Sequence, residues 1–433
     1  MNSKWNEKLN QVTENTLIVG MDIAKRTHYA CFVDERGRVL EKSFAVHQSK
    51  EGFEVLYENV LHAMKVYEKT DVIVGIEPTG HYWMNLAYFL DNYGIPLVMV
   101  NPMHVKKAKE LDDNLQTKND KKDAVVIARL MKDGRFSYPR ILKNIEAEFR
   151  NGSTLRSKMT EDLSGIKNRI VRWLDRYFPE FTQVYPTFGK MALATLEKTP
   201  FPRDIIGKTA EELVFLYRQV EGMRAPQLPK AKLLINVANN SIGLREGLQM
   251  ARLEIATLLR QYRLLEEEIE MINSHLAELA KSTEDYVYLT SVPGLGDATI
   301  VDLLSEVGSF SQYENPRQLI KLAGLTLREN SSGQHQGHKH ISKRGRKRLR
   351  SVLFKVIVPL VRHNIAFKHL HEYYTSLQRN PLRGKQSMVV LCGKLLKVLH
   401  GICKKKVHFN EQHMMNDVHC LSTAAYAFFY RTN

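Results

Sequence analysis

The stretch LIVGMDIA, residues 17–24, decides the fold of the first part of this chain. Five residues without a polar side chain lead directly into an acid, Asp22, which is the pattern of a strand buried on both faces. The stretch DVIVGIE, residues 71–77, repeats this pattern and ends at Glu77. Two buried strands that both end in a carboxylate predict a sheet with acidic side chains at one edge.

Strand and helix signals alternate around these two stretches. The strand-like runs occupy residues 17–24, 28–34, 39–46, 71–77 and 95–100. Helical apolar spacing occupies residues 49–69, 80–94, 101–111 and 120–134. A three-stranded meander followed by alternating helices and strands is the arrangement of an RNase H-like fold. We therefore expect an α/β domain of this class over residues 1–145.

Residues 146–285 are predicted to be helical, because strand signals vanish there and prolines break only the part around 180–240 into short helices. A long helix is predicted at about 244–282. Its apolar residues alternate steps of three and four, which forms a heptad seam: Ile255, Leu258, Tyr262, Leu265, Ile269, Ile272, Leu276 and Leu279. The seam fits a coiled coil, and it fits equally a helix packed inside its own domain.

The third part, residues 286–433, is predicted to be a helical domain. Its stretch YLTSVPGLGDATIVDLLSEVG, residues 288–308, has the pattern of helix, tight turn and helix. Gly294 and Gly296 allow a phosphate backbone to approach closely, and the start of the second helix presents free N–H groups. The pattern predicts a helix-hairpin-helix that grips phosphates without reading bases, although a plain αα-hairpin also fits.

The composition favours a nucleic-acid partner. The chain of 433 residues carries 63 Lys and Arg against 47 Asp and Glu, a formal net charge of +16, and such an excess suits nucleic acid first and an anionic membrane second. We find no apolar run long enough to cross a bilayer and no apolar core of a signal peptide at the N-terminus. The four cysteines form no CxxC pair, which suits a reducing cytosol. We therefore expect a cytoplasmic protein without a membrane partner.

A second pair of acids, Asp120 and Asp123, lies in KNDKKDA, residues 118–124. Their i, i+3 spacing places both on one face of the helix predicted there. With Asp22 and Glu77 at strand ends, four carboxylates can surround one spot, and such hard oxygen ligands suit Mg²⁺. Alternatively, Asp120 caps the helix and Asp123 pairs with a neighbouring lysine. The order of the four acids along the fold favours a metal site for phosphoryl transfer.

A basic segment, GLTLRENSSGQHQGHKHISKRGRKRLRSVLF at residues 324–354, lies in the third part. Seven cations lie close together in this segment, and they can hardly face one another. They therefore predict phosphate contacts by Lys339, Lys343, Arg344, Arg346, Lys347, Arg348 and Arg350. The small residues of SSGQHQG, residues 331–337, predict a loop with an exposed hydroxyl, which a serine nucleophile requires. A flexible Ser/Gly turn explains the same composition.

Together these motifs resemble the IS110 family of DEDD-type insertion-sequence transposases, also called bridge recombinases, over most of the chain. The family's RuvC-like domain carries acids in the order Asp, Glu, Asp, Asp, which maps onto the four acids above, and residues 117–130 match the last two closely. The family's C-terminal domain carries a helix-hairpin-helix, here residues 291–304, and an SG…G…ISKRG…LR block, here residues 331–350. The serine before the glycine of that block maps to Ser332, which follows Ser331.

The resemblance implies a DNA transposase in which the serine attacks a DNA phosphodiester and forms a phosphoserine, while the four carboxylates bind Mg²⁺. It also implies donor and target DNA as partners, together with a structured noncoding bridge RNA that supplies sequence choice. The family's coiled coil joins its two domains and helps to form a dimer or tetramer, which matches the seam. The helices around 180–240 look longer than a minimal member needs, and the tail after about 401 carries no family motif.

Two other functions fit part of the sequence. A metal-dependent, junction-resolving nuclease would use water as its nucleophile, and Ser332 would then be structural. A non-catalytic nucleic-acid-binding descendant of a transposase would not need four intact acids. A covalent protein–DNA adduct is expected only for the recombinase.

Overall fold

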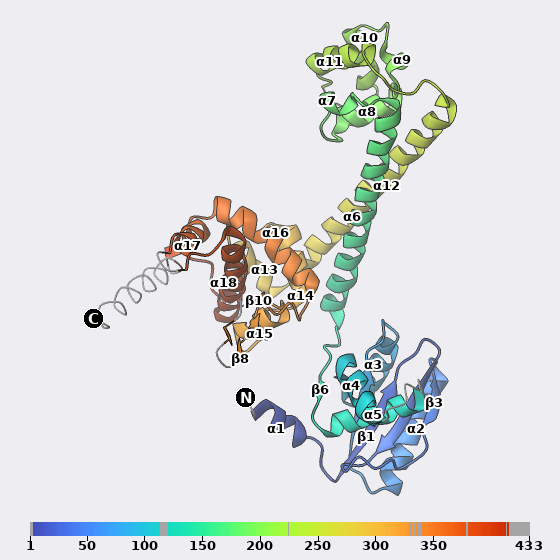
Figure 1. Cartoon of the computed structure of the whole chain (residues 1–433), viewed down its shortest axis with the longest axis vertical. Coiled ribbons are helices and arrows are strands. Elements are labelled where there is room, and N and C mark those ends of the chain that lie inside the picture. The colour runs from blue at the N-terminus through green and yellow to red at the C-terminus, as the bar shows by residue number, and fades with distance from the viewer. Residues whose placement is uncertain are drawn as a thin grey trace, which may run out of the picture. The chain divides into compact units, whose positions relative to one another are not determined.

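The structure, a computed structural model, describes residues 3–112, 120–223, 225–328, 331–332, 335–336, 340–377, 380–412 and 414. It divides into two compact units, residues 1–142 and 143–433 (Figure 1). The first unit is a mixed α/β domain and the second is mostly helical, as the sequence predicts.

A six-stranded sheet forms the centre of the first unit, in the order β3-β2-β1-β4-β5-β6. β2 pairs antiparallel with β1 and β3, β4 lies parallel to β1 and β5, and β6 is antiparallel to β5. The strands are β1 (Thr16–Asp22), β2 (Thr27–Val33), β3 (Phe44–His47), β4 (Asp71–Glu77), β5 (Leu97–Val100) and β6 (Phe136–Ser137). This is the order expected for an RNase H-like meander. The third strand is shorter than predicted, because Val39 makes only an isolated bridge to Val33.

Helices cover both faces of this sheet. The helices α2 (Lys50–Val66) and α3 (Trp83–Asn92) pack on one face, and α4 (Pro102–Asp112) and α5 (Asp120–Lys132) pack on the other. Alternate residues of β1 serve the two cores: Leu17, Val19 and Met21 face α2 and α3, and Ile18 faces α4 and α5. A short helix, α1 (Ser3–Leu9), precedes the sheet.

Two long antiparallel helices, α6 (Asn144–Tyr177) and α12 (Leu248–Lys281), pack along each other in the second unit (Figure 1). The Trp173 indole donates to the carbonyl of Ala251 at 2.9 Å, and Arg156 donates to the side chain of Asn273 at 3.2 Å. The predicted seam thus packs against a helix of the same chain, and its two ends are buried in different cores. Its fully buried members are Ile255, Leu258, Tyr262 and Leu276.

Short helices occupy the proline-rich region between the two long ones. They are α7 (Phe181–Val184), α8 (Lys190–Lys198), α9 (Pro202–Ile205), α10 (Ala210–Arg218) and α11 (Leu228–Asn239). Together with the adjoining ends of α6 and α12 they enclose a hydrophobic core rich in aromatic side chains, including Trp173, Phe178, Phe201 and Tyr217. The insertion around 180–240 therefore has a core of its own.

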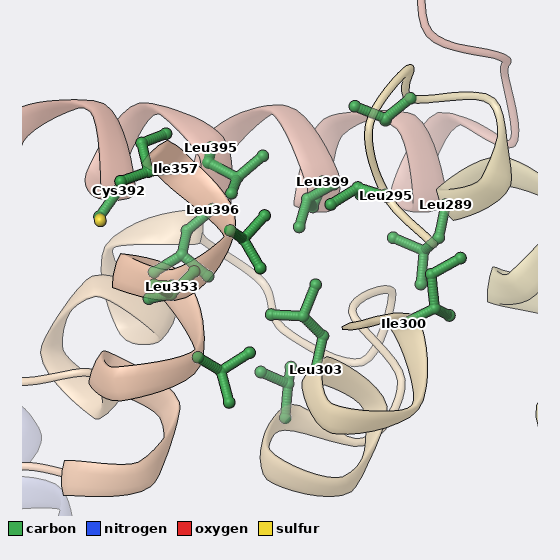
Figure 2. Packing of buried hydrophobic residues seen from close by; sticks show 14 of the residues in the cluster. Leu289, Leu295, Ile300, Leu303, Leu353, Ile357, Cys392, Leu395, Leu396 and Leu399 are labelled. Carbon is green, nitrogen blue, oxygen red and sulfur yellow. The ribbon is translucent and has the colours of Figure 1, made fainter. Parts of the chain in front are cut away.

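The C-terminal part of the second unit is built around a second core. Its helices are α13 (Glu284–Thr290), α14 (Asp297–Val307), α15 (Pro316–Leu322), α16 (Lys347–His363), α17 (Ile365–Ser376) and α18 (Gly384–Lys405). Figure 2 shows how Leu395, Leu396 and Leu399 of α18 face side chains from α14 and α16. This packing fixes α14, α15 and α16, and the last two of these helices flank the predicted serine segment in the sequence.

One helix of the described part of the chain, α18, is long and apolar enough to span a membrane, whereas the sequence pattern predicted none. Half of its apolar window is buried inside the protein, among the C-terminal core. Cys31, Cys392 and Cys403 are buried free thiols. Burial raises the pKa of the Cys392 thiol to about 12, so this thiol stays protonated.

Candidate functional site

The first half of the candidate site lies at the edge of the sheet where β1 and β4 end. Asp22 and Glu77 are the last residues of these parallel strands, and they are direct register partners. Neighbouring strands lie about 4.8 Å apart, so the two carboxylates start from adjacent points of the backbone. Both residues are half-buried, and each directly follows at least four buried residues of its strand. The sequence pattern predicted this pairing.

Helix α5 brings a third carboxylate to this edge because two glycines let it lie very close to the sheet. A Cβ at Gly20 of β1 would stand 2.1 Å from the carbonyl oxygen of Ala124, and one at Gly75 of β4 would stand 1.9 Å from the sulfur of Met131. Gly20 and Gly75 are register partners, so they form a shallow seat for the helix. Asp123 on this helix is only 7% exposed.

A lysine supplies the positive charge at this cluster. The Nζ of Lys109, on α4, lies 2.5 Å from a carboxylate oxygen of Asp123. Burial raises the pKa of Glu77, the Lys109 ammonium opposes that rise, and the Asp123 carboxylate adds to it. These charges interact although they come from β4, α4 and α5. We call Asp22, Glu77 and Asp123 the sheet-edge acids.

The fourth predicted acid, Asp120, is the first residue of α5. Its backbone is described, and its side chain lies outside the described part of the structure. The described residues do not decide whether Asp120 caps the helix or joins the cluster. The alternative of a lysine partner holds for Asp123, which pairs with Lys109 of α4.

The fit of a divalent cation can be judged from the side chains that the structure does describe. Among them, no group of three or more His, Cys, Asp or Glu side chains is arranged tightly enough to hold a metal ion. The Lys109 ammonium nevertheless occupies a cation position beside Asp123 and acts electrostatically on Glu77. The sheet-edge acids thus already attract one positive charge, and carboxylate oxygens are the donors that Mg²⁺ prefers.

The second half of the candidate site is the serine segment of the C-terminal part. Ser331–Ser332 form a two-residue strand, β8, that pairs antiparallel with β9 (His335–Gln336), and the register sets Ser332 opposite His335. The pair β7 (Leu327–Arg328) and β10 (His340–Ile341) flanks them in the sequence. The side chains of β8 and β9, and all of Lys339, lie outside the described residues.

The predicted phosphate-binding cations after this segment divide into two sets. Lys343, Arg344 and Lys347 are exposed. Arg346, Arg348 and Arg350 are half-buried and bind groups of this chain. For example, Arg350 donates to the carbonyl of Ala323 at 2.8 Å. The prediction of phosphate contacts stays a prediction for both sets, and the second set also has partners inside the chain.

The partners of Arg346 and Arg348 are two acids of α14, Asp302 and Glu306, which we call the α14 acids. Glu306 is 1% exposed, receives a hydrogen bond from Arg150 of α6 at 2.7 Å, and lies 3.8 Å from Arg348 and 3.9 Å from Arg346. Further contacts join Asp302 to Arg156, Arg348 and the hydroxyl of Ser153. This network ties the start of α16 to α6 and α14. The sequence interpretation missed it, and the i, i+4 spacing of the two acids was the available signal.

The predicted hairpin of helices is present as α13, a turn and α14. Gly294 in the turn has φ +97°, and a Cβ there would stand 3.0 Å from Leu360 of α16, so both the backbone and the packing favour glycine. Gly296 is the N-cap of α14, and open space surrounds it. The carboxylate of Asp297, in the first turn of α14, accepts a hydrogen bond from the Tyr286 hydroxyl at 2.8 Å.

Comparisons with known proteins cover both halves of the site. Residues 19–179 match the DEDD_Tnp_IS110 family model, described as a transposase, and residues 286–375 match the model described as "Transposase IS116/IS110/IS902 family". The first match contains the sheet-edge acids and Asp120. The second contains the helical hairpin and the serine segment.

Relatives match over most of the chain. The "Transposase for insertion sequence element IS1111A" of Coxiella burnetii is 24% identical over 347 residues, which cover 80% of this chain and 78% of that protein. The "Pilin gene-inverting protein" of Moraxella lacunata is 22% identical over 405 residues, which cover 91% and 98%.

Among solved structures, "T. thermophilus RuvC in complex with Holliday junction substrate" matches 27% of this chain and 91% of that chain at 21% identity, with a TM-score of 0.20. At this TM-score the match adds nothing to the strand order described above. The two family matches and the relatives agree with each other, and on these grounds the chain belongs to the IS110 family of transposases.

Proposed function

We propose that this chain cuts and rejoins DNA at the ends of an insertion sequence through a phosphoserine intermediate on Ser332. The observation that carries the proposal is the group of sheet-edge acids, in which Asp22 and Glu77 are register partners and Asp123 interacts with Glu77. A repulsive group of carboxylates is stabilised by a divalent cation, which a phosphoryl-transfer site needs. The printed names of the relatives, a transposase and a gene-inverting protein, agree with DNA rearrangement.

The cation in this proposal is Mg²⁺, held by Asp22, Glu77 and Asp123 with Asp120 as the fourth ligand. When bound, it would stabilise the charge that develops on the scissile phosphate. The chain's own residues prepare the place, because Gly20 and Gly75 seat α5 and Lys109 offsets the negative charge. Other phosphates of the DNA are proposed to contact the exposed cations of the C-terminal part.

In the proposed reaction the Ser332 hydroxyl oxygen attacks the phosphorus of a DNA strand. A bond forms between that oxygen and phosphorus, one bridging P–O bond of the strand breaks, and the released sugar hydroxyl takes up a proton. His335, the register partner of Ser332, is a residue type that accepts a serine proton. Attack by a sugar hydroxyl of another strand then reverses these steps and joins the new pair of ends.

Sequence choice is proposed to come from a structured noncoding RNA that pairs with donor and target DNA. The exposed cations Lys343, Arg344 and Lys347 suit contacts to phosphates, which fix position and carry no sequence information. The carboxylates and the serine belong to different units of the chain. We propose that they complete one another's site between protomers of a dimer or tetramer, with the α13–α14 hairpin as a helix-hairpin-helix on the DNA backbone.

The test is to trap the covalent adduct. Wild type, Ser332→Ala and Ser331→Ala are incubated with the guide RNA, Mg²⁺ and a DNA substrate nicked near the cleavage point, so that the cut strand diffuses away and cannot be rejoined. Denaturing gels and peptide mass spectrometry should find DNA on Ser332 in wild type and Ser331→Ala, and none in Ser332→Ala or with chelator.

The other outcomes identify the competing functions. Metal-dependent cutting that Ser332→Ala retains, without an adduct in wild type, would identify a junction-resolving nuclease. Tight binding without any cutting would identify a non-catalytic nucleic-acid-binding protein. Sequencing of RNA that co-purifies with the protein tests the guide separately, since a guided enzyme should carry one discrete RNA.

A further inference from the structure

A basic groove lies on the face of the first unit that α4 and α5 cover. Its volume is ≈ 550 Å³, and it is formed by α4, α5, the residues after α5 and the turn that follows β2. Its lining contains one carboxylate, Asp133. It also contains five Lys or Arg side chains, which are Arg36, Lys107, Arg129, Lys132 and Arg135. None of these residues belongs to the sheet-edge acids or to the basic segment of the C-terminal part.

The lining of the groove is positively charged on balance, because it has five cations and one carboxylate. Lys132 lies 3.4 Å from Asp133 and Arg36 lies 3.6 Å from Glu35, and both ion pairs are at the surface. Such pairs contribute little and exchange readily with solvent ions. A concave surface lined mainly by one sign of charge focuses its potential and attracts a polyanion.

The turn that forms one wall is fixed by its own hydrogen bonds. The Asp34 carboxylate accepts the N–H groups of Arg36 at 2.9 Å and Arg38 at 2.8 Å, and Gly37 adopts φ +84°. A Cβ on Gly37 would lie 3.4 Å from the Lys132 side chain and 3.7 Å from that of Arg129. The turn therefore packs on the side chains of these two residues, and the Nζ of Lys132 would also lie 3.7 Å from the same Cβ.

Helix α5 connects the groove to the sheet-edge acids, because Asp123 lies near its start and Arg129 and Lys132 lie near its end. At 1.5 Å per residue, these two cations stand about 9 and 14 Å from Asp123 along the helix axis. One strand of B-form DNA advances about 3.4 Å per nucleotide, so the same spans correspond to about three and four nucleotides.

We propose that this groove binds the phosphates of the DNA strand that is cut, about three to four nucleotides from the bond that reacts. The inference rests on the proposed function for the identity of that strand. It adds a contact on the first unit that orients the strand across the sheet-edge acids. The helix that supplies Asp123 then also supplies the backbone clamp.

The test compares two triple variants of the full chain that remove equal charge. The groove variant is Arg129→Gln, Lys132→Gln and Arg135→Gln. The control is Lys42→Gln, Lys50→Gln and Lys65→Gln, which are exposed residues of the same unit, two of them on α2 on the opposite face of the sheet. Thermal melting first verifies that both variants fold like wild type.

Binding of a random-sequence DNA duplex of about 30 base pairs is measured by fluorescence anisotropy in chelator, over about 50 to 300 mM salt. The groove variant should lower the slope of log affinity against log salt by about 2 to 3, and weaken binding by at least about tenfold at the low-salt end. The control should shift either quantity much less. The same measurement is repeated with an RNA hairpin. An equal loss of DNA affinity in both variants, or a loss of affinity for the RNA hairpin alone, would overturn the proposal.

A crosslink then tests the predicted distance. A photoreactive amino acid is placed at position 132. The crosslinked DNA is either the strand trapped as the covalent adduct or, in a complex kept uncut by chelator, a strand labelled at its cleavage site. Crosslinks should fall within about five nucleotides of the cleaved bond, and crosslinks mainly beyond about ten would contradict the path along α5. The anisotropy assay needs no cleavage. It therefore tests DNA binding by the groove even if the proposed serine mechanism proves wrong.

Discussion

The sheet-edge acids and the α14 acids are built from the same residue types and have opposite charge balance. Among the side chains that the structure describes at the sheet edge, Lys109 interacts with Glu77 and Asp123, and burial together with Asp123 raises the pKa of Glu77. On α14, the carboxylates of Asp302 and Glu306 meet four arginines from α6 and the start of α16. The first cluster retains an attraction for cations, and the second is saturated.

We interpret the difference as that between the proposed site for chemistry and a structural joint. A buried carboxylate with several charged hydrogen bonds holds its helix in place. Removal of one partner leaves part of its charge uncompensated in the interior. Carboxylates that repel one another instead bind a cation strongly, because the cation relieves both burial and repulsion. Charge balance around an acid is therefore a better guide to its role than its burial alone.

The largest expected effect separates the clusters by activity. Asp123→Asn should reduce DNA cleavage by at least about a hundredfold, because the neutral amide no longer serves as a charged metal ligand. The melting temperature should change little, since a half-exposed lysine is the described ion-pair partner. Single-turnover cleavage with saturating DNA, compared with Asp112→Asn on the neighbouring helix, provides the measurement. Full activity in Asp123→Asn would remove the sheet-edge acids from the reaction.

The next effect separates the clusters by stability. Arg150→Met should lower the free energy of unfolding of the second unit by about 3 kcal/mol, because the buried Glu306 then loses its hydrogen-bonded cation and keeps only the two arginines at 3.8 and 3.9 Å. Urea unfolding monitors the change. Arg172→Met, an exposed position on the same helix, is the control. Equal stability of the two variants would show that the α14 acids are not a structural joint.

A smaller effect tests the role of Lys109 as a resident cation. Lys109→Met should change stability by less than about 1 kcal/mol, because the lysine is more than one-third exposed. It should also tighten Mn²⁺ binding severalfold in calorimetry, since the metal no longer competes with the ammonium. Lys106→Met, exposed on the same helix, should bind Mn²⁺ as wild type does. Weaker binding in Lys109→Met would contradict competition for the same place.

The smallest effect concerns Asp285, a buried acid of α13. Burial raises the pKa of Asp285, although its carboxylate accepts the Phe310 N–H at 2.6 Å. The folded state therefore holds this proton to higher pH than the unfolded state, so its contribution to stability is present at low pH and is lost as pH rises through the raised value. Asp285→Asn should flatten this part of the pH profile of the urea midpoint. An unchanged profile would exclude Asp285 as its source.

Local patterns were sufficient to predict the parts of the molecule that short stretches encode. The runs ending at Asp22 and Glu77 predicted two adjacent buried strands, because a strand covered on both faces must be apolar until it reaches the edge. The pattern also predicted the α5 helix with Asp123, the long helix α12, and the turn at Gly294.

Pairings between distant segments were not predictable in this way. The basic segment suggested seven equivalent phosphate ligands, and only the fold shows that Arg346 and Arg348 meet acids of α14 and groups of α6, up to 195 residues away. The described ion-pair partner of Asp123, Lys109, comes from α4, and the seat formed by Gly20 and Gly75 decides which face of α5 meets the sheet.

The central claim is that the sheet-edge acids take a divalent cation and the α14 acids do not. Crystals of the full chain grown with Mn²⁺ test it directly, because anomalous scattering locates the metal without reference to activity. The expected result is a peak beside Glu77 and Asp123 with Lys109 displaced, and no peak at Asp302 and Glu306. A peak at the α14 acids, or a metal-saturated crystal with no peak at the sheet edge, would contradict the claim.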